Sequence, residues 1–131
     1  MNRDEFVKQY TVFVKYAITL AQKARREGLL ALENGIDMIK ADERDIFEYG
    51  MRFAVDGYDP RIIEKILGNI IGQEKDEYKR ILKTIQMEAV FGIQMGDNPK
   101  IMYYKLNSLT DIPLKDDEIY TSVFSGDGTG E

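Results

Sequence analysis

One local device divides this chain into helix-length pieces and limits the possible folds more than any other feature. A capping residue followed by proline occurs twice, as Asp59-Pro60 and Asn98-Pro99. Aspartate and asparagine accept hydrogen bonds from the first N–H groups of a helix, and proline fits the first turn because its missing N–H needs no partner there. Gly57 and Gly96 precede these starts, where the chain turns between helices.

Between these points apolar residues recur three and four positions apart, the period of a helix buried on one side. The pattern predicts helices over residues 4–34, 42–55, 60–72 and 74–96 and from 99 onward, the second capped by Asp42. The fold class is therefore all-α, a compact bundle of four to five helices with an acidic flexible C-terminal tail. The expected inner positions are Phe6, Tyr10, Phe13, Val14, Ala17, Leu20, Ala21, Ala24, Ile46, Phe47, Met51, Ala54, Ile62, Ile63, Ile66, Leu67, Ile70, Ile71, Tyr78, Ile81, Leu82, Ile85, Ala89, Val90, Ile101, Met102, Leu106 and Leu109.

The C-terminal segment differs in composition from the rest. Residues 1–110 form the expected helical domain, and residues 111–131 form an acidic tail with six acids and one base, Lys115. Its last seven residues, SGDGTGE, are too polar to join a core, so we expect the tail to be mostly disordered. Residues 118–124 could form a short strand or a docked arm, although no partner strand is evident.

The absence of certain residue types excludes much chemistry. The 131 residues include no Cys and no His, which removes disulfides, thiolate nucleophiles, Ser-His-Asp triads and Cys-ligated metal sites. We expect neither an enzyme nor a bound cofactor or metal. No apolar stretch approaches the roughly 20 residues that span a membrane, so we expect a cytoplasmic protein without membrane insertion. A net charge of -5 disfavours nucleic-acid binding.

The charge is unevenly distributed along the chain. Residues 1–26 contain six bases and two acids, a net charge of +4, so residues 27–131 carry -9. The bases of the first helix could form ion pairs with the later helices, which is common for surface charge. Alternatively, the first helix offers a docking edge to a charged partner. The sequence leaves both interpretations open.

Three segments resemble, in order, the cytoplasmic parts of one protein family. They are residues 24–33 (ARREGLLALE), residues 56–60 (DGYDP) with the Ile-rich helix after them, and residues 87–100 (MEAVFGIQMGDNPK). They resemble the MotA family of bacterial flagellar stator proteins, in the wider ExbB/TolQ class, where an "IQ-G-NP" pattern precedes a final helix. The resemblance covers roughly residues 14–114 and implies a helical cytoplasmic domain.

The sequence also departs from that family. The family has two membrane helices before the first segment and two between the second and third, whereas here residues 74–86, seven of them charged, join these segments directly. Lys100 replaces the family's Arg after the proline. The resemblance therefore implies the interaction part of a stator without ion-channel activity.

In that family, one Arg and one Glu of the cytoplasmic domain face the charged surface of FliG, the torque-receiving rotor protein. The resemblance places them at Arg25 and Glu33, with Lys23 and Arg26 beside them. On one continuous helix, the eight-residue spacing puts Arg25 and Glu33 on neighbouring faces. Gly28 interrupts the apolar pattern, which marks a close helix contact or a bend, and it is expected to let a neighbouring helix approach. The other expected structural positions are Gly57, Asp59, Pro60, Gly96 and Pro99.

The expected partners are a FliG-like rotor protein or stator subunits, at the periphery of the flagellar motor. The alternative is a structural helical oligomer or adaptor unrelated to motility, a homo-oligomer built on the apolar face of residues 60–72. Asp42, Glu43 and Asp45 could bind a cation, although acids also favour a helix N-terminus without one. The six methionines are expected to fill the core.

Overall fold

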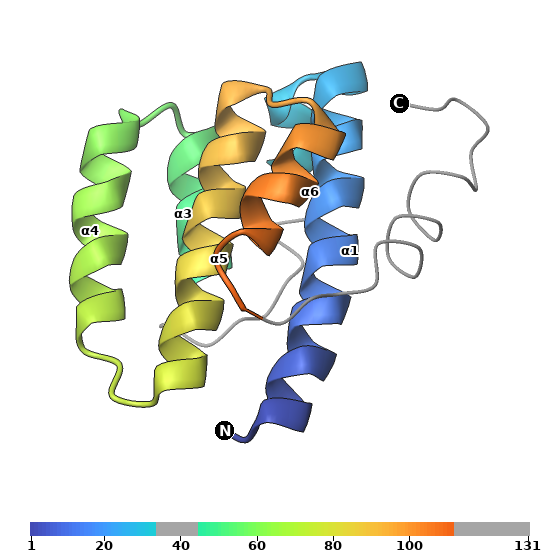
Figure 1. Ribbon diagram of the computed structural model, residues 1–131. Coiled ribbons are helices and arrows are strands. Elements are labelled where there is room, and N and C mark those ends of the chain that lie inside the picture. Colours follow the sequence, from blue (N-terminus) through green and yellow to red (C-terminus); the bar gives the residue numbers. More distant parts are fainter. Residues whose placement is uncertain (34–44, 112–131) are drawn as a thin grey trace.

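The computed structural model describes residues 1–33 and 45–111 (Figure 1). Over these ranges the chain forms α1 (Arg3–Glu27), the 3₁₀ helix η1 (Leu29–Leu32), α3 (Ile46–Val55), α4 (Pro60–Gly72), α5 (Glu77–Met95) and α6 (Pro99–Asn107), and no strand. The predicted all-α bundle is confirmed. The predictions for the acidic tail, and the cation site considered at Asp42 and Glu43, lie outside the described residues. The predicted cap at Asp42 is wrong, because α3 begins at Ile46 and Asp45 caps it. No helix within the two described ranges is long and apolar enough to cross a membrane.

α5 runs through the centre of the bundle and contacts α1, α3, α4 and α6. In Figure 1, α1 and α4 lie on opposite sides of it, α6 lies in front, and α3 lies behind. Because α5 is surrounded, it buries residues around much of its circumference, including Leu82, Ile85, Ala89 and Val90. These four positions were predicted to face inward, and the structure confirms them.

The core is continuous and contains most of the predicted inner positions. On α3 all four of them, Ile46, Phe47, Met51 and Ala54, are buried. The predictions for Ile62, Ile66 and Ile101 are wrong, because these side chains are between 38% and 52% exposed. α4 lies at the edge of the bundle, where it contacts α3 and α5, so it buries only the narrow stripe of Ile63, Leu67 and Ile71.

The first helix ends earlier than predicted. α1 stops at Glu27, and Gly28 caps it with φ 91° and ψ 159°, donating its N–H to the carbonyl of Ala24. This backbone conformation is essentially restricted to glycine, so the chain turns here and continues as η1. The role predicted for Gly28, close approach of a helix, is wrong: a Cβ there would meet nothing within 4 Å.

Close helix contact occurs instead at two glycines that the sequence did not single out for it. A Cβ on Gly50 of α3 would lie 2.6 Å from Cγ2 of Val90 on α5. A Cβ on Gly92 of α5 would lie 2.8 Å from Sδ of Met102 on α6. Both distances are shorter than side-chain carbons tolerate, so these glycines set the spacing of α3 and α6 against α5.

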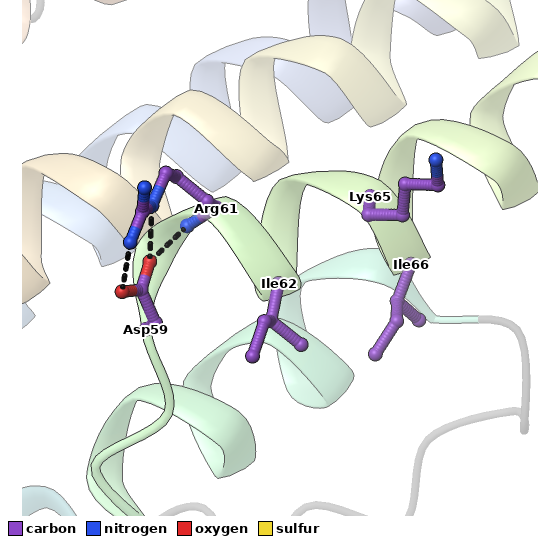
Figure 2. A pocket seen from close by; sticks show the side chains of 5 residues that line it. All are labelled: Asp59, Arg61, Ile62, Lys65 and Ile66. Atoms are coloured by element: carbon purple, nitrogen blue, oxygen red, sulfur yellow. Dashed lines mark hydrogen bonds and ion pairs between the residues drawn. The ribbon is translucent and has the colours of Figure 1, made fainter.

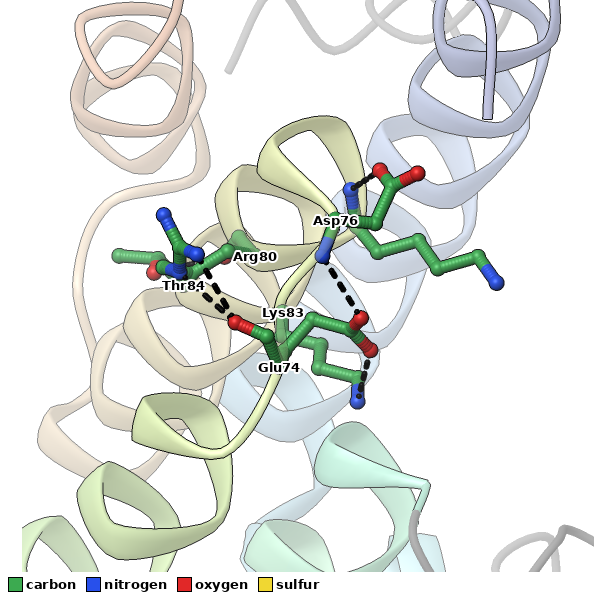
Figure 3. A network of polar contacts seen from close by, with 6 residues as sticks. Glu74, Asp76, Arg80, Lys83 and Thr84 are labelled. Carbon is green, nitrogen blue, oxygen red and sulfur yellow. Dashed lines mark hydrogen bonds and ion pairs between the residues drawn. The ribbon is translucent and has the colours of Figure 1, made fainter.

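The connection between α4 and α5 is closed by a polar network (Figure 3). Asp76, not Glu74, marks the start of α5, because its Oδ1 accepts the N–H of Lys79. The Glu74 carboxylate binds Nζ of Lys83 at 2.8 Å, and the Glu74 carbonyl accepts two hydrogen bonds from the Arg80 guanidinium. The hydrogen bond from Lys83 lowers the pKa of Glu74 to about 2.

Candidate partner-binding site

The three segments that resemble the stator family meet at one end of the bundle. Figure 1 shows α1 ending, the α3–α4 connection and the α5–α6 turn all at the top of the molecule, away from the chain's N-terminus. Two hydrogen bonds join the segments. Arg25 Nη1 donates to the Gly96 carbonyl at 3.4 Å, and Gln94 Nε2 donates to the Tyr58 carbonyl at 3.0 Å. Residues up to 71 positions apart in the sequence thus form one surface.

The α3–α4 connection has the predicted construction. Gly57 has φ 86°, and Oδ1 of Asp59 accepts the N–H of Arg61 at 2.7 Å, so Asp59 caps α4 with Pro60 in its first turn. The Arg61 guanidinium also binds both carboxylate oxygens of Asp59. These hydrogen bonds lower the pKa of Asp59. The turn is therefore fixed locally, by residues within five positions of each other.

The α5–α6 turn is also built as predicted. Gly96 adopts the left-handed conformation at φ 73°, and the N–H of Asp97 returns to the Gly92 carbonyl at 2.9 Å. Asn98 caps α6, and Pro99 is buried in its first turn. Nζ of Lys105 binds the Asp97 carboxylate at 2.8 Å, and this hydrogen bond raises the pKa of Lys105.

The predicted basic residues lie on the last two turns of α1. Arg25 and Arg26 are exposed and Lys23 is half-buried. Bases here are favourable because they face the negative end of the helix dipole. None of the three forms an ion pair within residues 1–33 and 45–111, and Arg25 makes only its long bond to Gly96. The internal ion pairs considered for the first helix are thus not found in this part of the chain.

Glu33 is exposed at the end of η1. The predicted geometry for Arg25 and Glu33, neighbouring faces of one continuous helix, is wrong. Gly28 ends α1 between them, so the two side chains are carried by separate elements. Their relative placement depends on the turn at Gly28 rather than on the helical repeat.

The predicted partner-binding residues were all charged and did not include the exposed apolar residues of this end. Leu30 on η1 is 69% exposed, Met95 at the end of α5 is 68% exposed, and Tyr58 in the α3–α4 connection is half exposed. Met95 contradicts the expectation that the methionines fill the core. A sequence signal was available, because Met95 directly precedes the capping Gly96, where a helix runs out of the bundle. Charged and apolar side chains together make this end suited to protein contact.

The outer face of α4 is a second exposed apolar feature (Figure 2). Ile62 and Ile66 lie side by side in a shallow groove that Arg61 and Lys65 border. Figure 2 shows the two isoleucines pointing the same way from α4. This face is the one on which the homo-oligomer alternative depends.

Asp45 is the member of the predicted acidic cluster that the structure describes, and it has a structural role. Oδ1 of Asp45 accepts the N–H of Glu48 at 2.9 Å and caps α3. Within residues 1–33 and 45–111, no group of three or more metal-binding side chains lies together. The N-terminus of α3 therefore accounts for Asp45 without a cation.

Part of the chain is similar to a known motility protein. No protein-family model matches the chain. A stretch of 66 residues is 36% identical to Motility protein A of Borreliella burgdorferi, and it makes up 50% of this chain and 24% of that protein. The chain thus matches less than a third of the relative's length. The similarity supports a MotA-like relationship for half of the chain, which agrees with the resemblance seen in its motifs.

Proposed function

We propose that this chain is an interaction module of the flagellar motor, which binds a FliG-like rotor protein through Arg25, Glu33 and the neighbouring Lys23 and Arg26. As proposed, it acts by contact at the cytoplasmic side of the motor, and not by ion transport or catalysis. The partial similarity to Motility protein A supports the association with motility. The choice of the rotor as partner rests on the resemblance of residues 24–33.

One observation carries the proposal. The three resembling segments are held together at one end of the bundle by hydrogen bonds from Arg25 to Gly96 and from Gln94 to Tyr58. A shared binding surface would account for the resemblance of all three segments to one protein family, although they lie far apart in the sequence. Residues used only for packing would instead be spread through the core.

The chemistry of this end suits a contact that forms and breaks quickly. Exposed charges steer two proteins together and speed association, but each pair adds little affinity in water. The exposed Leu30 and Met95 supply apolar area that exposed charges alone lack. Binding should therefore be fast, weak and sensitive to ionic strength.

The test is a binding measurement between the full chain and the FliG-like rotor protein of the same organism. We expect Arg25→Glu and Glu33→Lys each to weaken binding about tenfold or more, equivalent to ~1.4 kcal/mol. The matched control is Lys79→Glu, an exposed base at the opposite end of α5, which should change the Kd less than about twofold. Equal binding by all variants would overturn the site, and no binding by the unmodified chain would overturn the partner.

The exposed isoleucines of α4 favour a second candidate function, a homo-oligomer. If copies join through this face, light scattering should give a mass that rises with concentration, and Ile66→Asp should restore the mass of a single chain. Ile66 is 38% exposed, so the aspartate can reach water without unfolding α4. A single-chain mass over the whole concentration range would exclude this candidate.

A further inference from the structure

The outer face of α1 is a basic and apolar surface, distinct from the end of the bundle. Its middle is a shallow groove lined by Lys8, Gln9, Val12, Phe13 and Tyr16. Val12 is 68% exposed, so its apolar side chain is open to a ligand in the groove. The rings of Phe13 and Tyr16 pack edge-on against Phe47 of α3, with centroids 5.0 and 5.7 Å away. Two of the residues that line the groove are therefore positioned by packing against α3.

Positive charge borders this groove. Lys8 and Lys15 are exposed and form no ion pair within residues 1–33 and 45–111. The acids nearest the lysines on the helix, Asp4 and Glu5, lie in its first turn, and Asp45 lies near Tyr16 on the α3 side of the groove. A ligand that fits should therefore carry acids beside apolar side chains.

This chain contains such a segment. Residues 116–118 are Asp-Asp-Glu, and residues 119–124 are Ile-Tyr-Thr-Ser-Val-Phe, so three acids are followed by a mostly apolar stretch. We propose that residues 116–124 of this chain dock on the outer face of α1, with the acids at Lys8 and Lys15 and the apolar residues in the groove.

The position of α6 supports this assignment. α6 packs against α1, and the Tyr10 hydroxyl of α1 donates a hydrogen bond to Oδ1 of Asn107, the last residue of α6. The chain therefore leaves the bundle beside α1, at the level of the groove. Five extended residues beyond Asp111 reach about 16–18 Å, comparable to half the circumference of a helix about 10–12 Å wide.

Basic and then apolar residues follow one another around α1, in the same order in which acidic and then apolar residues follow one another along residues 116–124. The α5–α6 side of α1 is marked by Arg25, which binds Gly96, and the α3 side by Tyr16. At 100° per residue, Lys15 and Lys8 lie about 140° and 160° around the exposed side of the helix from Tyr10, which bonds Asn107, and Val12 lies about 200° around. A chain that passes around α1 from α6 meets the lysines first and the groove second, as its acids precede its apolar residues.

Weak contacts suffice for such docking because the segment is tethered. A short linker gives an effective concentration in the millimolar range, so pairs that would not hold a free peptide can hold a tethered one. The lysine contacts are exposed and thus screened at high ionic strength. The inference does not depend on the proposed rotor contact, which uses the other end of α1.

Cysteine cross-linking in the full chain tests the proposal. The chain has no native cysteine that could compete with the introduced pair. The test variant carries Val12→Cys and Val123→Cys. The control carries Ile62→Cys and Val123→Cys, because Ile62 is a similarly apolar residue, 51% exposed on α4. Mild oxidation of the dilute protein, followed by mass spectrometry without reductant, gives the rate of disulfide formation within one chain.

We expect the test pair to form its intramolecular disulfide at least about tenfold faster than the control pair. Adding Lys8→Glu and Lys15→Glu should reduce that rate to the control level, and so should raising the salt to about 1 M, where screening acts within ~3 Å. Equal rates for the two pairs would overturn the proposal, as would an unchanged rate after charge reversal. Disulfides formed between chains instead of within one would assign the groove to a second copy.

Discussion

The two ends of this bundle contain similar side chains and use them in opposite ways. At the α4–α5 end, Glu74, Asp76, Arg80 and Lys83 all have partners in the structure. At the other end Asp59 and Asp97 are paired with Arg61 and Lys105, but Lys23, Arg26 and Glu33 have no partner within residues 1–33 and 45–111. The difference shows that charge in a sequence does not reveal its role, because the same residue types close one end and leave the other available.

The backbone differs between the ends as well. The closed end has a turn at Gln73–Asp76 that needs no positive φ, and its stability comes from side-chain hydrogen bonds. The open end depends on three glycines with positive φ, Gly28, Gly57 and Gly96. Glycine backbone conformations therefore shape the turns of the open end in addition to its polar contacts, whereas the closed end is held by polar side chains without such glycines. Substitutions of a glycine at the open end and of a charged residue at the closed end should therefore show what each end depends on.

The largest effect should come from Gly28→Ala. A residue with a Cβ is strained at φ 91° and ψ 159°, at a cost of roughly 1–3 kcal/mol. We expect chemical denaturation to show this loss, or η1 to shift so that Glu33 no longer keeps its position. Rotor binding, if the proposal holds, should then fall even where the helices remain folded.

Gly68→Ala is the matched control for that variant. Gly68 is exposed inside α4 with an ordinary helical backbone, and a Cβ there meets nothing within 4 Å. Alanine should therefore stabilise the protein by about 0.5–1 kcal/mol through helix propensity. If Gly28→Ala stabilised the protein as Gly68→Ala is expected to do, the turn at Gly28 would not need its glycine, and the proposed difference between the two ends would be wrong.

Lys83→Met should have the next largest effect, at the closed end. Nζ of Lys83 binds Glu74 at 2.8 Å, and both side chains are less than a quarter exposed. Methionine keeps the length of the side chain but leaves the carboxylate without this partner. We expect the midpoint of thermal unfolding to fall by a few degrees. Lys65→Met is a suitable control, because Lys65 is exposed on α4 and forms no ion pair in the described part of the chain.

The closed end should also give the protein a specific pH dependence. The folded pKa of Glu74 is about 2 against an ordinary value of 4.5. Its stabilisation is therefore complete above pH 4.5 and is lost as the pH falls from about 4.5 to about 2. Urea unfolding across this window should show a smaller pH dependence in Lys83→Met than in the unmodified chain. Asp59 and Asp76, whose pKa values are also lowered, contribute equally to both proteins and cancel in the difference.

Much of the fold followed from local chemistry in the sequence. The caps at Asp59 and Asn98, the prolines after them, and the inner face of α3 were predicted correctly because a helix start or a buried stripe is a property of a few neighbouring residues. The exposure of Ile62 and Ile66 was not predicted, because it depends on α4 lying at the edge of the bundle. A helical period indicates which side is apolar but not how many helices cover it.

The candidate site could be predicted only in part. The basic residues were chosen from residues 24–33, the segment that resembles the stator family. Their predicted position relative to Glu33 was wrong, because the apolar pattern continues past Gly28 although α1 ends there. The joining of Arg25 to Gly96, 71 positions apart, depends on tertiary packing that no local pattern contains. The glycines that allow close helix contact, Gly50 and Gly92, are likewise recognisable only from the residues opposite them.

The smallest effect should come from removing charge at the open end. Lys23→Ala and Arg26→Ala should change the free energy of unfolding by no more than about 0.5 kcal/mol, because neither side chain has an ion-pair partner within residues 1–33 and 45–111, and only a weak helix-dipole interaction is lost. Alanine also favours the helix, which offsets part of that loss. Urea denaturation beside Lys83→Met would measure the contrast directly. A loss as large as that of Lys83→Met would mean that these bases stabilise the fold, and the two ends would not differ in the way described. A negligible loss of stability together with weaker rotor binding would instead identify charge that the fold leaves available for a partner.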